Sequence, residues 1–93
     1  MKELVQSSGL TQAELAKLMR VARPTVSLWL NGKAFPGELT EVKWNTLLDA
    51  IKAAVDTQDL PLPNTLTPQE REAEINRRLT PHILRAKERS TTG

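Results

Sequence analysis

Signals for two short consecutive helices lie between Thr11 and Gly32, and they restrict the fold more than any other feature of the sequence. Thr11 and Glu14 have the spacing of a capping box, in which a hydroxyl and a carboxylate satisfy two free backbone amides at a helix start. The helix that they open is expected over Gln12–Met19. Pro24 suits the first turn of a second helix, which Gly32 can end in a left-handed conformation. These signals predict two helices joined by a tight turn.

Apolar side chains recur in both helices at i, i+3 and i+4, the spacing of one helical face. These positions are Leu15, Leu18 and Met19 in the first helix, and Val26, Trp29 and Leu30 in the second. Ala16 is small enough to let two steeply crossing helices approach each other, and Val21 can fill the turn between them. We therefore expect the two helices to pack together as a helix-turn-helix.

The remainder of the sequence also predicts helices. Alternating β-branched runs are missing, and the aromatic residues are limited to Trp29, Phe35 and Trp44. A short helix is expected around Lys2–Ser7, and a longer one over about Glu38–Val55. The apolar face of this longer helix comprises Trp44, Leu47, Leu48, Ile51 and Val55. The fold class predicted is all-α: a small helical bundle with a helix-turn-helix and a C-terminal helical tail.

A proline-rich segment divides the chain. Pro61 and Pro63 disfavour helix at the residues before them, so this segment is expected to be an extended linker. We predict a domain over residues 1–58, a linker over 59–67 and a helical tail over 68–93. Pro81 is expected to interrupt or kink the tail helix, because it removes a hydrogen bond to the preceding turn. The end of the tail, residues 90–93, is expected to fray.

Charge is distributed unevenly, although the net charge is only +2. Residues 1–35 hold five basic and two acidic side chains, residues 36–66 hold two and five, and residues 67–93 hold six and four. A basic front segment raises the expectation of a polyanionic partner, and ordinary surface charge is the alternative. The tail arginines, expected to form a solvated face or to add phosphate contacts, are Arg71, Arg77, Arg78, Arg85 and Arg89.

Several classes of protein do not fit this sequence. The absence of cysteine excludes a disulfide framework and cysteine-based zinc sites. No segment approaches the ~20 apolar residues of a membrane span, and the N-terminus does not have the pattern of a signal peptide, so we expect a cytoplasmic protein. His82 is the only histidine and follows Pro81 in a tail expected to be weakly ordered. We predict no enzyme activity, no metal site and no cofactor.

The face of the second helix opposite its apolar residues has an unusual composition. It presents Arg23, Pro24, Thr25, Ser27, Leu28 and Asn31. A solvated helix surface usually carries many lysines and glutamates, whereas this face is nearly uncharged. Short hydrogen-bonding groups beside an apolar contact are suited to reading base edges in the major groove of DNA. This composition indicates a DNA-binding helix.

At this level of detail the sequence resembles a known family. Residues 11–19 (TQAELAKLM), together with residues 26–33 (VSLWLNGK) and Pro36, are similar to the Cro/lambda-repressor-like (XRE-type) helix-turn-helix family of phage repressors, bacterial regulators and antitoxins. The resemblance covers about residues 10–36. Arg20 stands where the family usually has Gly, which costs roughly 1–2 kcal/mol if the residue is left-handed. Ala22 stands where the family has Ser or Thr, so a helix cap worth about 1 kcal/mol is lost.

The resemblance implies a role for each residue of the motif. Gln12, at the start of the first motif helix, would bind a phosphate. Arg23 would make a bidentate contact to a guanine, and Leu28 would pack on a thymine methyl group. The remaining contacts to bases or phosphates are assigned to Pro24, Thr25, Ser27, Asn31 and Lys33. Trp29 and Trp44 are expected in the core rather than as stacking platforms for bases.

The function predicted is that of a sequence-specific regulator of transcription that binds double-stranded DNA. The resemblance favours a phage or prophage Cro-like repressor that binds a palindromic operator as a homodimer, in the cytoplasm or nucleoid of a bacterial host. Candidate dimer surfaces are the helix of Trp44 and the apolar tail residues Ile75, Leu79, Ile83 and Leu84. An antitoxin is the alternative, in which residues 67–89 bind a protein partner and DNA binding serves autoregulation.

Overall fold

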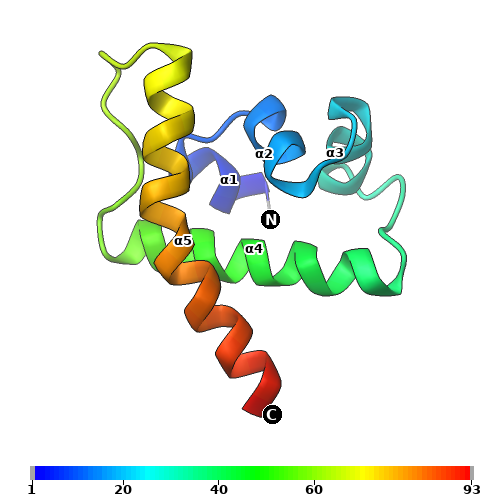
Figure 1. Ribbon diagram of the computed structural model, residues 1–93. Helices are drawn as coiled ribbons and strands as arrows, with labels where there is room; N and C mark the ends of the chain where they lie inside the picture. Colours follow the sequence, from blue (N-terminus) through cyan, green and yellow to red (C-terminus); the bar gives the residue numbers. More distant parts are fainter. Residues whose placement is uncertain (1, 93) are drawn as a thin grey trace.

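Helix α4 (Glu38–Asp56) is the support on which the other elements pack in the computed structural model (Figure 1). Helices α1 (Lys2–Ser8), α2 (Gln12–Met19) and α3 (Arg23–Leu30) lie on one side of it, and α5 (Pro68–Thr92) crosses it. The structure describes the backbone of residues 2–92 and the side chains of residues 3–88. It contains helices and no strand over that range, which confirms the all-α fold with a helix-turn-helix.

The core lies between α4 and the helices above it. Trp44, Leu47 and Ile51 of α4 are buried, and Leu48 and Val55 are partly buried beside them, as the apolar spacing predicts. The rings of Trp29 and Trp44 are in contact, with centroids 5.3 Å apart and planes tilted by 58°. Such a tilted aromatic pair adds to the stability gained from area burial alone. Both tryptophans are therefore core residues, as expected.

The segment between α4 and α5 is irregular and packed against the rest of the chain. Leu60 and Leu62 are buried in the same hydrophobic cluster as α4 and α5. Gly9, in the turn after α1, has a φ of +69°, and a Cβ at this position would lie 2.9 Å from the Cβ of Pro61. Only glycine fits a left-handed turn with so close a neighbour. Residues 59–67 thus contribute to the core, which the proline content alone does not indicate.

Helix α5 is continuous through Pro81, so of the two outcomes expected there, an interruption or a kink, the interruption does not occur. Ile75 and Leu79 before the proline, and His82 and Ala86 after it, are all buried. This packing on both sides of the proline offsets the loss of one backbone hydrogen bond. The helix changes direction where it passes α4 (Figure 1). The backbone is helical to Thr92, and Gly93 of the end predicted to fray lies outside the described residues.

Two arginines of α5 are structural, which corrects the expectation that the tail arginines form a solvated face. Arg71 donates from Nε and Nη2 to the two carboxylate oxygens of Glu14, each at 2.9 Å, and from Nη2 to the carbonyl of Gly9. Arg78 donates to Glu74 and to the carbonyl of Asp59. The bonds of Arg71 attach α5 to the start of α2 and to the turn before it, and the bond from Arg78 to Asp59 attaches α5 to the segment after α4. Arg77, by contrast, is exposed and pairs only with Glu74 among the described contacts.

His82 is buried, so its placement in a weakly ordered tail is also wrong. Its Nε2 lies 2.8 Å from a carboxylate oxygen of Asp59, which also accepts a hydrogen bond from the Thr57 hydroxyl at 3.0 Å. The hydrogen bonds from His82 and Thr57 outweigh the cost of desolvation and hold the pKa of Asp59 below its ordinary value. The chain after α4 and the middle of α5 are joined through these three side chains.

Candidate nucleic-acid interface

The start of α2 has the geometry that its sequence predicts. The Thr11 amide donates to Glu14 Oε1 at 2.9 Å, and the Glu14 amide donates to Thr11 Oγ1 at 3.1 Å. This capping box is confirmed, and it places the half-buried side chain of Gln12 at the first position of the helix. Backbone amides at this end carry the positive end of the helix dipole, which favours a phosphate nearby.

The turn between α2 and α3 is left-handed at Arg20, with φ 58° and ψ 44°. The Val21 amide donates to the carbonyl of Ala16 at 3.0 Å, which closes the end of α2. Ala22 precedes α3 without a side-chain cap, and Pro24 occupies the first turn instead. Both departures from the family pattern are therefore present in the structure, and the turn still forms.

Helix α3 is anchored by its apolar face. Val26 is fully buried, and Trp29 and Leu30 are 9% exposed. The helix ends at Leu30 and is capped by Asn31; Gly32 follows with a φ of +69°, and the Lys33 amide donates to the carbonyl of Leu28 at 2.9 Å. This pattern, together with a bond from the Gly32 amide to Trp29, is a Schellman motif. It fixes the direction in which the chain leaves α3 for α4.

The predicted contact residues lie on the remaining surface of this unit. Arg23, Pro24, Leu28, Asn31 and Lys33 are exposed, and Gln12, Thr25 and Ser27 are partly buried. Leu28 is 43% exposed, so an apolar side chain is available for contact on this surface. The structure thus leaves all eight predicted residues accessible from solvent, on α3 and on the two segments that flank it.

Two of these residues are already hydrogen-bonded to each other. The Asn31 side-chain amide donates to the Ser27 carbonyl at 2.8 Å and to the Ser27 hydroxyl at 3.3 Å. These bonds hold the Asn31 side chain against the last turn of α3 rather than extended into solvent. A side chain held in this way loses less conformational entropy when it contacts a ligand.

Electrostatics favour an anion at this surface. Helix α3 contains no acidic residue, and Arg23 and Lys33 lie at its two ends. The Glu14 carboxylate, the acid of α2, is occupied by Arg71 of α5. Burial works against the Glu14 charge, but hydrogen bonds from Arg71 and Thr11 prevail and hold its pKa below the ordinary value. The one acidic charge within α2 and α3 is therefore neutralised by the chain itself.

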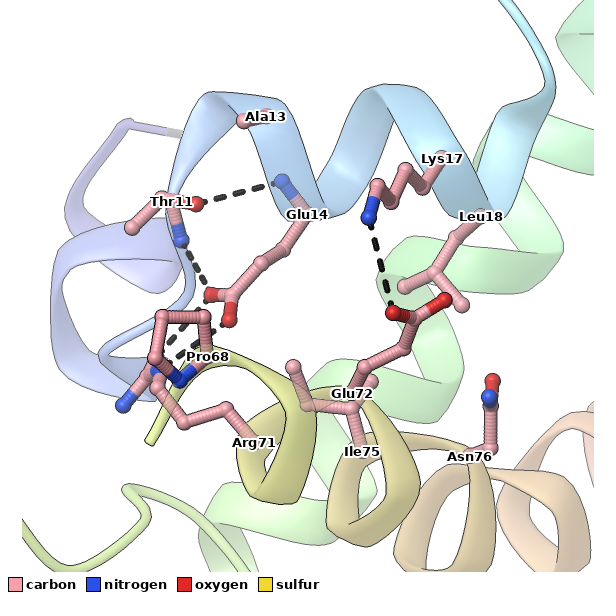
Figure 2. A pocket seen from close by; sticks show the side chains of 10 residues that line it. All are labelled: Thr11, Ala13, Glu14, Lys17, Leu18, Pro68, Arg71, Glu72, Ile75 and Asn76. Carbon is pink, nitrogen blue, oxygen red and sulfur yellow. Dashed lines mark hydrogen bonds and ion pairs between the residues drawn. The ribbon is translucent and has the colours of Figure 1, made fainter. Parts of the chain in front are cut away.

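A groove of about 530 Å³ lies between α2 and α5 (Figure 2). Leu18 and Ile75 form part of its lining, and the Glu14–Arg71 and Lys17–Glu72 pairs cross it. The two pairs join residues far apart in the sequence, so no local pattern predicts them. The charged groups that line the groove are paired with one another, and these ion pairs hold α5 against α2.

Two other kinds of site are absent from the described residues. In this part of the chain no group of three or more His, Asp or Glu side chains is placed to hold a metal ion. None of its helices is both long enough and apolar enough to cross a membrane.

Comparison with known proteins agrees with the geometry of α2 and α3. The model of a family described as "Helix-turn-helix" matches residues 1–38, which span α1, α2, α3 and the loop to α4. A search of curated proteins and a search of solved structures found no match. Residues 1–38 belong to the helix-turn-helix family of the Cro/lambda-repressor-like (XRE) type, and the protein is a DNA-binding regulator of transcription.

Proposed function

We propose that this regulator is a sequence-specific repressor of the phage or prophage Cro-like kind, which binds a palindromic operator as a homodimer. The observation that carries the proposal is the outward face of α3, which holds an arginine, short polar side chains and an exposed leucine, and no acid. Such a face is complementary to the edges of base pairs in the major groove. Because the target is DNA, the proposed place of action is the host cytoplasm or nucleoid.

Direct base contacts are assigned to the N-terminal and central part of α3. Arg23 is the first residue of the helix and is exposed, so its guanidinium can reach the O6 and N7 acceptors of a guanine. Leu28, which lies five residues after Arg23 and is also exposed, offers an apolar contact to a thymine methyl group. Thr25 and Ser27 supply hydroxyl groups between these two positions, and Pro24 fills the space beside Arg23.

Contacts to the DNA backbone are assigned to the ends of the motif. Gln12 lies at the start of α2, where the helix dipole favours a phosphate. Asn31 and Lys33 lie at the end of α3, and Lys33 supplies a positive charge. Contacts at both ends would fix the orientation of α3 in the groove without adding sequence information.

A homodimer is proposed because one motif contacts too few base pairs for a specific complex. Two motifs related by a two-fold axis read two half-sites about one helical turn apart, which doubles the number of base contacts. The operator would then be an inverted repeat, since the symmetry of the protein is repeated in the DNA.

Selection of bound sites from random double-stranded DNA tests this proposal. We expect the selected sequences to converge on an inverted repeat whose half-sites are centred about 10 base pairs apart or a multiple of this. Convergence on a single unrepeated half-site would contradict the dimer. A selected pool no richer in any sequence than the starting pool would contradict sequence-specific reading.

The antitoxin alternative draws no support from the apolar face of α5. Ile75 and Leu79, which a partner would have to contact, are buried in the protein's own core. An autoregulated antitoxin would use the same DNA-binding surface, so the α3 assignments hold under both alternatives. The two alternatives differ in the role that they give to residues 67–89.

A further inference from the structure

Three large apolar side chains are exposed where the chain passes from α3 into α4. Phe35 and Leu39 are each 84% exposed, and Val42 is 60% exposed. None of the three belongs to the hydrophobic core of the described residues. Exposed apolar groups gathered in one place on a small protein mark a surface that another molecule covers.

Leu39 and Val42 lie on the face of α4 that α5 covers further along the helix. Steps of three and four residues lead from Leu39 through Val42 and Thr46 to Ala50, so these residues share one face. Ala50 is fully buried and Thr46 is 7% exposed, whereas Leu39 and Val42 are exposed to solvent. Figure 1 shows α5 crossing the C-terminal part of α4 and leaving its N-terminal part uncovered.

A groove of about 540 Å³ adjoins this uncovered face and includes Val42 in its lining. It lies between the end of α2, the N-terminal half of α4 and the second half of α5, and its apolar lining includes Val42, Leu47 and Ile83. The charged residues among its described lining are Arg20, Lys43 and Lys87, all of them basic. The surface is therefore apolar at its centre and positive along one side.

The opposite side of the same stripe is acidic. On a helical projection of α4, Lys43 and Glu38 fall on opposite sides of the Leu39–Val42 stripe, with Glu41 beyond Glu38. Among the described residues, none of Arg20, Lys43, Glu38 or Glu41 takes part in an ion pair within the chain. The stripe thus separates two sets of charges of opposite sign.

We propose that this surface binds a second copy of the same chain about a two-fold axis through Leu39 and Val42. When two such helices cross steeply, the apolar stripes meet on the axis, and Glu38 of each copy lies against Lys43 of the other. An isologous interface requires a surface complementary to itself, and a stripe with opposite charges on its two sides has that property. The inference deepens the proposed function, because it names the partner that places two α3 helices on one operator.

The position of α3 agrees with this choice of interface. Helix α3 joins the N-terminal end of α4 directly, through residues 31–37. The molecule measures 37 × 32 × 21 Å, and half-sites one turn of DNA apart require about 34 Å between recognition helices. Pairing through the end of the molecule near α3 keeps the two helices within that range. Pairing through the opposite end, near the start of α5, would separate them by far more.

Reciprocal charge reversal tests the interface. Lys43→Glu and Glu38→Lys, each alone, place like charges together twice in a symmetric dimer, so each should raise the dimer dissociation constant by about tenfold or more. An equimolar mixture of the two variants restores both opposite-charge contacts in the mixed dimer. Sedimentation equilibrium should therefore show the mixture associating more tightly than either variant alone. A mixture no tighter than its components would overturn the proposal.

Matched variants separate this effect from a general change of charge or hydrophobicity. Lys52→Glu and Asp49→Lys reverse charges on α4 further from the stripe, and Leu84→Asp removes another exposed apolar side chain, 55% exposed on α5. These three should leave the dissociation constant unchanged, whereas Leu39→Asp should yield a monomer with unchanged helix content by circular dichroism. Equal weakening by the Leu39 and Leu84 variants would contradict the assignment.

The outcomes distinguish this inference from the DNA-binding proposal. If the chain associates through this surface but selects no DNA sequence, the interface stands and the proposed function fails. If it binds an inverted repeat while the Leu39→Asp variant remains a dimer, the proposed function stands and the interface is wrong. A wild-type chain that stays monomeric at all concentrations, with or without its operator, would contradict the proposed interface. The exposed surface would then bind a different protein.

Discussion

Arg20 occupies a backbone conformation that suits glycine, and the chain accepts the resulting strain. Its φ is 58°, and Gln58, which follows α4, has a φ of 66° in the same kind of helix ending. A left-handed residue with a side chain costs roughly 1–2 kcal/mol. Two such residues in a 93-residue chain take up a noticeable part of a modest stability.

Replacement by glycine should recover that cost. We expect Arg20→Gly and Gln58→Gly each to raise the free energy of unfolding by about 1 kcal/mol, measured by urea denaturation at one protein concentration. Gln58 serves as the matched position, because it lies outside both the DNA-binding surface and the proposed dimer surface. Destabilisation by Arg20→Gly while Gln58→Gly stabilises would show that the Arg20 side chain has a structural contact of its own.

Local residue patterns predict the local features and miss the distant ones. The Thr11–Glu14 box and the left-handed Gly32 follow from residues within four positions of one another, whereas the left-handed Arg20 and the missing cap at Ala22 were implied by the resemblance to the family. The Arg71–Glu14 pair joins residues 57 positions apart, and the His82–Asp59 pair joins residues 23 apart. Nothing in the neighbouring sequence of either partner indicates such contacts.

At the scale of the elements, helix positions were predictable and their packing was not. Capping signals and apolar periodicity place all five helices to within a few residues of their observed bounds. The continuity of α5 through Pro81 depends on burial of residues on both sides of the proline, which a local rule does not include. The sequence equally offered no indication that Leu60 and Leu62 are core residues.

The attachment of α5 to α2 depends on pH in a defined direction. The pKa of Glu14 is held below its ordinary value of 4.5, so its charge stabilises the fold above that value, and this stability is lost as the pH falls below it. Glu14→Gln keeps an acceptor for the capping box but loses the ion pair with Arg71. We expect it to lower the free energy of unfolding by about 1 kcal/mol near pH 7.

The difference between wild type and Glu14→Gln should then shrink as the pH is lowered to about 3 in urea denaturation. Glu72→Gln is the matched control, because its pair with Lys17 is exposed and 3.5 Å long, and it should have no measurable effect. A Glu14→Gln loss that is the same at both pH values would show that the cap, and not the ion pair, accounts for it.

At the scale of the whole molecule, the proposed division into residues 1–58, 59–67 and 68–93 depends on how firmly α5 is held. Leu60, Leu62, Ile75 and Leu79 belong to one hydrophobic cluster with α1 to α4. The polar contacts of Arg71, Arg78 and His82 join the same parts. Composition suggested a linker and a weakly ordered tail, because prolines and mixed charges mark both disordered and packed segments.

Limited proteolysis of the native chain tests this arrangement. With a protease of broad specificity, residues 67–88 should resist cleavage on the time scale of global unfolding, because their backbone hydrogen bonds and apolar side chains are protected. Mass spectrometry identifies the first cuts. Rapid release of a core ending near residue 60 would contradict this expectation and would favour a tail that folds on an absent partner.

The central claim is that α3 reads base sequence through its exposed face, and competition binding with Arg23→Ala tests it most directly. On the selected operator, the variant should lose at least about tenfold in affinity, corresponding to one bidentate guanine contact, and retain the weak, salt-sensitive binding of wild type to random DNA. Lys52→Ala, which removes a distant positive charge, should change neither affinity. Equal loss by Arg23→Ala on operator and random DNA would contradict base reading by this helix.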